Sequence, residues 1–488
     1  MPDRRALLAS AGALAAGLAA SPLIWPVRSV AAVLPPPATP HGGRIVDCEL
    51  VAAERSFALP AFSGRSLPLW TFSATSPPPE LRVGLGDRLR VKLTNALTRP
   101  GEHVSIHWHG IRVPLAQDGV PYVSQAPVEP GRSFIYDFVP PDTGTFFFHT
   151  HCNTAEQLGR GLSGILIVDG DEVAPFDAER ILVMRDWRID PERGTFLPFF
   201  TDEGASGSGS FGPVRTVNGA VSPKIAVPPN ANIRIRLINI DATRISQIGL
   251  RQGNGLVIAV DGTAVEPFAL KDWWLGPAMR VDLALRTGAA GSIVELVDYF
   301  AEAPQVLARL EAGGAPVNSP ALTEPGLRAG RMAMPDLAQA ERLTFELTAT
   351  ATGARMSAPG PDDFSRVVMD SLCLSQKSFW AMNKQSWPGG DHARLPPPLT
   401  VLRQGRSYVM ELKNVSQVRH PIHLHGHSFR VLSSNKRTLP VHWADTVLVA
   451  PRERVEIALR ADNPGNWMFH CHLIEHQEAG MMGYVKIA

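Results

Sequence analysis

A short stretch near the end of the chain combines His470, Cys471, His472 and His476, with Met481 shortly after them. Imidazole, thiolate and thioether groups are ligands that suit copper in proteins. In a β-strand, alternate side chains point to opposite faces, so a strand here turns His470 and His472 to one face and Cys471 to the other. The stretch could therefore bind metal on both faces, with few covalent bonds between the two sites.

One cysteine, two histidines and a weak axial methionine form the ligand set of blue-copper sites. Cys471, His476 and Met481 supply three of these ligands, so the second imidazole must come from elsewhere. Further histidines occur in three motifs, His107-Trp108-His109-Gly110, His149-Thr150-His151 and His420-Pro421-Ile422-His423-Leu424-His425-Gly426. A single His-x-His pair is weak evidence of a metal site, whereas four such motifs in one chain strongly predict one.

The four motifs in this order resemble those of the multicopper oxidases, the family of laccases, bilirubin oxidases and bacterial cuprous and ferrous oxidases. The resemblance implies four copper ions, of which one is type 1, one is type 2 and two form a type 3 pair. The implied ligands are His420, Cys471, His476 and Met481 for type 1, His107 and His423 for type 2, and His109, His149, His151, His425, His470 and His472 for type 3.

The resemblance also implies an activity. A donor loses electrons singly at the type 1 copper, and Cys471 passes them to a three-copper cluster that reduces O2 to water. Phenols or aromatic amines are the expected donors, because the chain shows no long methionine-rich insert. The alternative donors are Cu(I), Fe(II) or Mn(II). A third reading is a non-enzymatic envelope or cell-division protein of the same fold, although such relatives have lost copper ligands and here every ligand position is filled.

Reduction of oxygen to water also consumes protons. Asp118, in the stretch Gln-Asp-Gly-Val-Pro, stands where family members carry an acid near the cluster, so it is a candidate proton relay. An aspartate before Gly119 is equally typical of a turn. Many bacterial relatives carry a second acid directly after the last type 1 histidine. Here that position is Gln477, and the chain departs from the family pattern.

The roles of the remaining histidines and cysteines are less specifically predicted. His427 is a candidate for orienting a ligand, and the surface or structural set is His41, His103, His392 and His442. Cys48, Cys152 and Cys373 remain if Cys471 binds copper, and an oxidising compartment would allow one disulfide. Alternation along a strand turns Cys152 away from the metal face, so it is either a packed thiol or half of a disulfide. Three aromatic residues either line a substrate pocket or pack in the core, namely Phe379, Trp380 and Trp387.

Short β-type runs separated by turn residues, with 43 prolines and 42 glycines, predict an all-β chain of sandwiches or barrels. The motif at 107–110 is followed by that at 149–151, and 423–426 is followed by 470–472 at a similar spacing, which indicates an internal duplication. The family resemblance implies three cupredoxin-like Greek-key β-sandwich domains. Their expected bounds are 41–170, 171–335 and 336–488, and the middle domain carries no copper ligand.

The N-terminus predicts export. Arg4 and Arg5 precede an apolar run that ends near Ile24, and 30–32 offers small residues for cleavage, so residues 1–32 resemble a twin-arginine signal peptide. The alternative is a membrane anchor. The implied destination is the periplasm or the cell exterior, with no stable membrane insertion after cleavage. A net charge of +1 gives no electrostatic footprint for nucleic acid.

Overall fold

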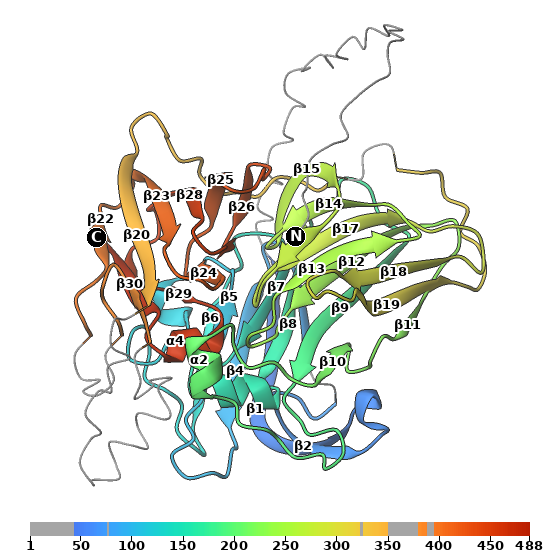
Figure 1. Cartoon of the computed structure of the whole chain (residues 1–488), viewed down its shortest axis with the longest axis horizontal. Helices are drawn as coiled ribbons and strands as arrows, with labels where there is room; N and C mark the ends of the chain where they lie inside the picture. The colour runs from blue at the N-terminus through green and yellow to red at the C-terminus, as the bar shows by residue number, and fades with distance from the viewer. Residues whose placement is uncertain (1–42, 76–77, 323–325, 350–378, 388–394) are drawn as a thin grey trace, which may run out of the picture. The chain divides into compact units, whose positions relative to one another are not determined.

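The computed structural model describes residues 43–75, 78–322, 326–349, 379–387 and 395–488. Strands dominate these residues and the helices are short, so the all-β prediction is confirmed (Figure 1). The expected signal peptide lies outside the described residues. Among the helices that are described, none has the length and the apolar character needed to cross a membrane.

The described strands form six sheets, which fall into three pairs along the chain. The first pair has the strand orders β2-β1-β4-β6 and β3-β8-β7-β5. Its strands are β1 (Ile45–Ala58), β2 (Ser66–Thr71), β3 (Glu80–Gly84), β4 (Arg88–Asn95), β5 (His107–His109), β6 (Ser133–Phe138), β7 (Gly144–His149) and β8 (Ser163–Asp169).

The second pair has the orders β10-β9-β12-β17-β14-β15 and β11-β19-β18-β13-β16. Its strands are β9 (Ala178–Trp187), β10 (Val214–Val217), β11 (Lys224–Val227), β12 (Asn232–Asn239), β13 (Ser246–Arg251), β14 (Gly255–Val260), β15 (Thr263–Ala269), β16 (Trp273–Leu275), β17 (Arg280–Arg286), β18 (Ile293–Asp298) and β19 (Gln305–Ala312).

The third pair has the orders β21-β20-β23-β28-β25-β26 and β22-β30-β29-β24-β27. Its strands are β20 (Glu341–Ala349), β21 (Trp380–Met382), β22 (Thr400–Leu402), β23 (Ser407–Asn414), β24 (His420–Leu424), β25 (Phe429–Ser434), β26 (His442–Ala444), β27 (Thr446–Val449), β28 (Arg454–Arg460), β29 (Gly465–Cys471) and β30 (Met482–Ile487). The described helical segments are η1 (Pro60–Phe62), η2 (Leu115–Gln117), α1 (Thr154–Arg160), α2 (Asp202–Ser206) and α4 (Ile474–Glu478).

All three pairs of sheets share one pattern of strand directions. Each pair has one parallel neighbour in its first sheet, namely β1–β4, β9–β12 and β20–β23. Each also has one in its second sheet, namely β3–β8, β11–β19 and β22–β30. The repetition seen in the histidine motifs of the first and third pairs therefore extends, at the level of topology, to the middle pair.

Each pair of sheets encloses an apolar core of its own. In β4, buried and more exposed residues alternate, and the buried set includes Leu89, Val91 and Leu93. This is the period of a strand with one face in the core. The largest buried side chains include Trp108 in the first pair and Trp467 in the third. These cores fix the strands that carry the histidines.

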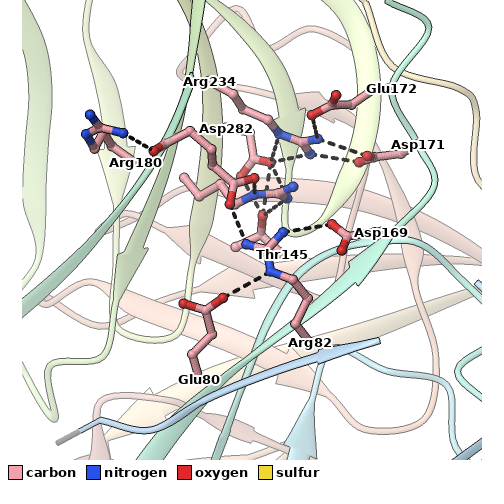
Figure 2. Close-up of polar contacts among 11 residues, drawn as sticks. Glu80, Arg82, Thr145, Asp169, Asp171, Glu172, Arg180, Arg234 and Asp282 are labelled. Carbon is pink, nitrogen blue, oxygen red and sulfur yellow. Dashed lines mark hydrogen bonds and ion pairs between the residues drawn. The ribbon is translucent and has the colours of Figure 1, made fainter. Parts of the chain in front are cut away.

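A buried ionic network joins strands of the first and second pairs of sheets. Figure 2 shows Arg234 of β12 between two carboxylates, and its guanidinium lies 2.7 Å from both Asp171 and Asp282. Thr145 of β7 donates a hydrogen bond of 2.9 Å to Asp282 and accepts one of 2.8 Å from Arg236. Because Asp282 is buried between two guanidinium groups, it offsets the cost of desolvating both positive charges.

Replacing Asp282 with alanine is expected to destabilise the protein strongly. Arg234 and Arg236 would remain buried without their shared counter-charge, and breaking such a pair costs about 3–5 kcal/mol in the free energy of unfolding. Chemical denaturation followed by tryptophan fluorescence measures the change. The control is Glu49→Ala, which removes an exposed ion pair with Lys92 and should change stability by less than about 1 kcal/mol. Equal stability of the two variants would contradict a structural role for this network.

Candidate metal centre

The histidine motifs occupy equivalent positions in the first and third pairs of sheets. Strand β5 pairs with β7 so that His107 lies opposite His149. Strand β24 pairs with β29 so that His423 lies opposite His470. The same antiparallel register therefore aligns two motifs in each pair of sheets. The main-chain hydrogen bonds between these strands fix the backbone positions from which the imidazole side chains extend.

All of the predicted ligands are buried, and none exposes more than 3% of its surface. They are His107, His109, His149, His151, His420, His423, His425, His470, Cys471, His472, His476 and Met481. The rings meet between the first and third pairs of sheets. His107 Nε2 lies 3.4 Å from His423 Nε2, and His149 Nε2 lies 3.3 Å from His472 Nε2.

Two other ligands of the predicted type 3 set meet at His425 Nε2 and His470 Nε2, which lie 3.0 Å apart. His151 completes a group in which the three ring nitrogens are all within 4.8 Å of one another. His109 belongs to a similar group with His107 and His149. The structure thus brings together the eight histidines that the sequence assigned to the type 2 and type 3 coppers.

Hydrogen bonds to main-chain carbonyls define which ring nitrogen carries the proton. The Nδ1–H group of His149 donates to Thr150 O at 2.8 Å, and that of His470 donates to Cys471 O at 3.0 Å. Burial and neighbouring imidazoles lower the pKa of both histidines, so each ring is neutral and carries one proton. Their Nε2 atoms therefore present lone pairs to the cluster.

Hydrogen bonds from Nδ1 to main-chain carbonyls also occur where the two pairs of sheets meet. His107 Nδ1 donates to Asp118 O at 2.9 Å and His423 Nδ1 donates to Asp445 O at 2.8 Å. With Nδ1 protonated, the two Nε2 atoms that face each other are both acceptors. Neither ring can then satisfy the other with a hydrogen bond, and a cation between them would satisfy both. The donor set thus fits copper, for which imidazole is a suitable ligand.

A second group of ligands surrounds Cys471 on the other face of β29. Its Sγ atom lies 3.6 Å from His420 Nδ1 and 3.8 Å from His476 Nδ1. Met481 is fully buried and its carbonyl accepts a hydrogen bond of 3.0 Å from the Cys471 amide. Burial raises the pKa of the Cys471 thiol. A bound metal cation is the ordinary means by which such a buried sulfur becomes a thiolate.

The carboxylate of Asp118 is buried beside the histidine cluster. Its Oδ2 atom accepts a hydrogen bond of 3.0 Å from His425 Nδ1. The next residue, Gly119, has φ of +79°, and a Cβ atom there would lie 1.7 Å from Ile106 O. The sharp turn therefore requires glycine. Asp118 is both a turn residue and a neighbour of two cluster histidines, so the two expectations for it are compatible.

Some contacts of the cluster had no signal in the sequence. Asp445 Oδ1 accepts a hydrogen bond of 3.0 Å from His109 Nε2, and Arg280 of β17 holds the same carboxylate at 2.6 Å. His476 Nε2 donates to Gly207 O at 2.7 Å. The contact of His109 with Asp445 joins the first pair of sheets to the third, and those of Arg280 and Gly207 join the middle pair to the third. Motif spacing carries no information about how these sheets dock.

Other residues that the sequence analysis singled out are packed within the protein. Trp380 is buried and its ring lies 4.6 Å from that of His476, which fits core packing rather than an open pocket wall. His427 is buried, and its Nδ1 donates to the main-chain carbonyl of His425 at 3.2 Å. His442 is buried against Trp273. The amide of Gln477 is buried, and its side chain makes no hydrogen bond with the described residues.

Cys48 and Cys152 are both free thiols. The Cys152 sulfur is buried and lies 3.7 Å from Ser105 Oγ, so the packed-thiol alternative describes it. Several residues with sequence-based expectations lie outside the described part of the chain, namely His41, Cys373 and His392.

Comparison with known proteins identifies the family. Two family models, both described as multicopper oxidase, match residues 60–173 and 372–488. A multicopper oxidase of Mycobacterium tuberculosis, MmcO, is 31% identical over 91% of this chain and 87% of its own length. A solved multi-copper oxidase from Pseudomonas thermotolerans is 37% identical, with a TM-score of 0.80 over 92% of this chain and 100% of that one.

Two further relatives carry more specific names. Laccase-1 of Botryotinia fuckeliana is 26% identical over 86% of this chain and 78% of its own length. The iron transport multicopper oxidase FET3 of Gibberella zeae is 26% identical over 83% of this chain and 70% of its own length. The likeness to solved multicopper oxidases confirms three cupredoxin-like Greek-key sandwiches as the fold. The histidine clusters, the fold and the relatives together lead to one conclusion: this chain belongs to the multicopper oxidase family.

Proposed function

We propose that this oxidase takes electrons one at a time from a reducing substrate beside Cys471 and delivers them to O2 at the histidine cluster, which forms water. The observation that carries the proposal is the position of Cys471 between His470 and His472. Cys471 faces the sulfur site, while the rings on either side of it face the cluster. A few covalent bonds of one strand therefore connect the two sites.

Four copper ions are the proposed cofactors, with one at Cys471 and three among the eight cluster histidines. Copper supplies one-electron redox chemistry at both places and the site where O2 is reduced. The protein's own groups hold the imidazoles in the required tautomers, exclude bulk water and supply protons. Asp118 is the proposed proton donor to the cluster, because its carboxylate contacts a cluster ring directly.

The donors are proposed to be phenols or aromatic amines, as in a laccase, and the relative named Laccase-1 supports this class. Cu(I), Fe(II) or Mn(II) are a second candidate class. One observation favours it, since His476 Nε2 already donates to Gly207 O and both type 1 histidines are fully buried. A large phenol therefore has no free ring nitrogen to bind. The relative named as an iron transport oxidase belongs to this second class.

Export by the twin-arginine route to the periplasm or cell exterior also remains a proposal, supported by Arg4, Arg5 and the apolar run after them. That route carries folded proteins, which suits a chain whose metal site forms only when distant sheets meet. The reading as a non-enzymatic envelope protein has less support, because every ligand position is filled and buried.

The decisive experiment is a copper assay with an optical spectrum on copper-loaded mature protein. About four copper ions per chain and the intense visible absorption of a copper–thiolate bond are expected for this ligand set. Steady-state oxidation of a phenol and of Fe(II) then separates the two donor classes. A colourless protein that binds no copper would contradict the proposal and would favour the envelope-protein reading.

Single substitutions should separate the two copper sites. Cys471→Ser removes the thiolate ligand, so the visible band and substrate oxidation should be lost while the cluster histidines remain. His149→Ala should keep the visible band and block oxygen reduction, because it removes one imidazole from the cluster only. Optical spectra and oxygen consumption measure both effects. Full turnover by either variant would show that the ligand assignment is wrong.

Asp118→Asn tests the proton relay and separates it from a turn role. Asparagine satisfies the same turn before glycine, yet it cannot donate a carboxylic proton. We expect reoxidation of the reduced protein by O2 to slow by about 100- to 10,000-fold, the usual contribution of a general acid. Reduction of the type 1 site by the donor should keep its rate. Stopped-flow spectroscopy resolves the two steps, and unchanged reoxidation would leave Asp118 with the turn role alone.

Asp445→Asn tests how His109 is oriented. His109 donates its Nε2 proton to Asp445, so it presents Nδ1 to the cluster, whereas His149 and His470 present Nε2. Burial alone would raise the pKa of Asp445, but the Arg280 guanidinium lowers it well below the ordinary value and keeps the carboxylate charged.

Loss of such a supporting carboxylate should weaken copper binding by the cluster about 10- to 100-fold. Titration with a copper chelator measures the affinity, and the visible band of the type 1 site should persist. The matched control is Asp137→Asn, which removes a carboxylate paired with Arg88 at the surface. Equal copper retention by both variants would contradict the role of Asp445.

A further inference from the structure

A segment of the middle pair of sheets covers the sulfur site. Helix α2 and the loop after it, residues 201–212, are called the cap here. The cap packs against α4, the short helix that carries His476, and Figure 1 shows α2 beside α4. Its sequence is rich in glycine and serine, which allows its backbone to lie close to α4.

The cap is anchored by one buried carboxylate. Glu475 of α4 accepts hydrogen bonds from the amide of Thr201 at 3.0 Å and from the hydroxyl of Ser210 at 2.8 Å, and also from the amide of Ser210. A Cβ atom at Gly204 would lie 2.5 Å from the Glu475 carboxylate, so no larger residue fits there. Hydrogen bonds to a charged group are stronger than neutral ones, and these fix both ends of the cap.

The centre of the cap closes over the type 1 histidines. The carbonyl of Gly207 accepts the Nε2–H group of His476 at 2.7 Å. The carbonyl of Ala205 accepts the indole N–H of Trp380 at 2.6 Å, and the Trp380 ring lies 5.0 Å from that of His420. The outward nitrogen of His476 is thus occupied by protein, and the Trp380 ring packs against the rings of both type 1 histidines.

We propose that electrons enter at the Gly207 carbonyl, and that the cap restricts efficient donors to those that need no direct contact with His476. This inference rests on the proposed function, since it assumes copper at Cys471. The hydrogen bond from His476 Nε2 to Gly207 O places a polar link between the buried ring and the outer face of the cap. An outer-sphere donor uses this link, whereas a phenol, which gains from direct contact with an imidazole, is oxidised less efficiently than it would be at an exposed ring.

The transfer itself involves no bond to the protein. The donor would lose one electron at the outer face, and a copper ion held by His420, Cys471 and His476 would accept it. A phenol also loses its hydroxyl proton to solvent and becomes a phenoxyl radical. A metal-complex donor such as ferrocyanide loses only the electron. Four such events are balanced by the reduction of one O2 to two water molecules with four protons.

Loosening the cap tests the inference. Ser210→Ala removes one hydroxyl donor to the buried Glu475, and amide exchange of residues 201–212 should accelerate by about tenfold. The ratio of kcat/KM for 2,6-dimethoxyphenol to that for ferrocyanide should rise several-fold. The control is Ser433→Ala, which removes a serine hydroxyl donating to Glu456 at an exposed site, and it should leave that ratio and the amide exchange of the cap unchanged.

A second variant displaces the cap more strongly. Gly209 has φ of +90°, and a Cβ atom there would lie 2.8 Å from the Thr243 Cβ atom, so Gly209→Ala must shift the loop. The visible band should stay, because no predicted copper ligand is changed. Faster amide exchange of the cap with an unchanged donor ratio in both variants would overturn the inference. A lack of copper and of the visible band in the unaltered protein would instead contradict the proposed function, so the two failures are distinguishable.

Discussion

The hydrogen bond between a buried imidazole Nδ1–H group and a carbonyl of its surroundings is the interaction on which this structure depends. In His149 and His470 it fixes the single ring proton on the side away from the cluster. Each Nε2 lone pair then points at the Nε2 atom of another ring, 3.3 Å away in His472 and 3.0 Å away in His425. His425 directs its Nδ1–H group to the Asp118 carboxylate, so both facing Nε2 atoms of the His425–His470 pair are acceptors. A cation between them satisfies both, and the arrangement therefore favours a bound metal ion.

The cluster also explains why three pairs of sheets are needed when only two carry ligands. The first and third pairs supply the histidines, which meet at His107 and His423. The middle pair contributes Arg280 to the carboxylate that orients His109, and Gly207 to His476. The middle pair of sheets therefore supplies no predicted ligand itself but contacts a ligand of one predicted copper site and a residue that supports a ligand of the other. The ionic network around Asp282 holds the middle pair against the first, so it also keeps these contacts in register.

The sequence was informative where chemistry depends on local spacing. The alternation of His470, Cys471 and His472 on a strand predicts two metal sites on opposite faces, and the side chains do diverge in this way. The twelve predicted ligands are all buried, and the ten histidines and Cys471 among them lie at the two sites. Asp445 and Gly207 could not be predicted, because one is an ordinary aspartate without a motif and the other acts through a main-chain carbonyl. Both depend on how separate sheets dock, which residue spacing does not encode.

Copper binding and docking of the sheets should consequently be one thermodynamic process. Two facing pairs of ring nitrogens, His107–His423 and His149–His472, join the first and third pairs of sheets. The lone pairs of His107 and His423 leave each other unsatisfied without a cation, so close approach of these sheets carries an electrostatic cost at this point. A bound cation removes that cost and adds its coordination energy to the folded state, as binding to the native state alone always does. The third sandwich also holds ligand contacts of its own, among Cys471, His420 and His476 and between His425 and His470, so copper bound there stabilises that sandwich directly. At the interface between the first and third sandwiches, where the strands that carry His107 and His423 meet, copper stabilises the docking itself.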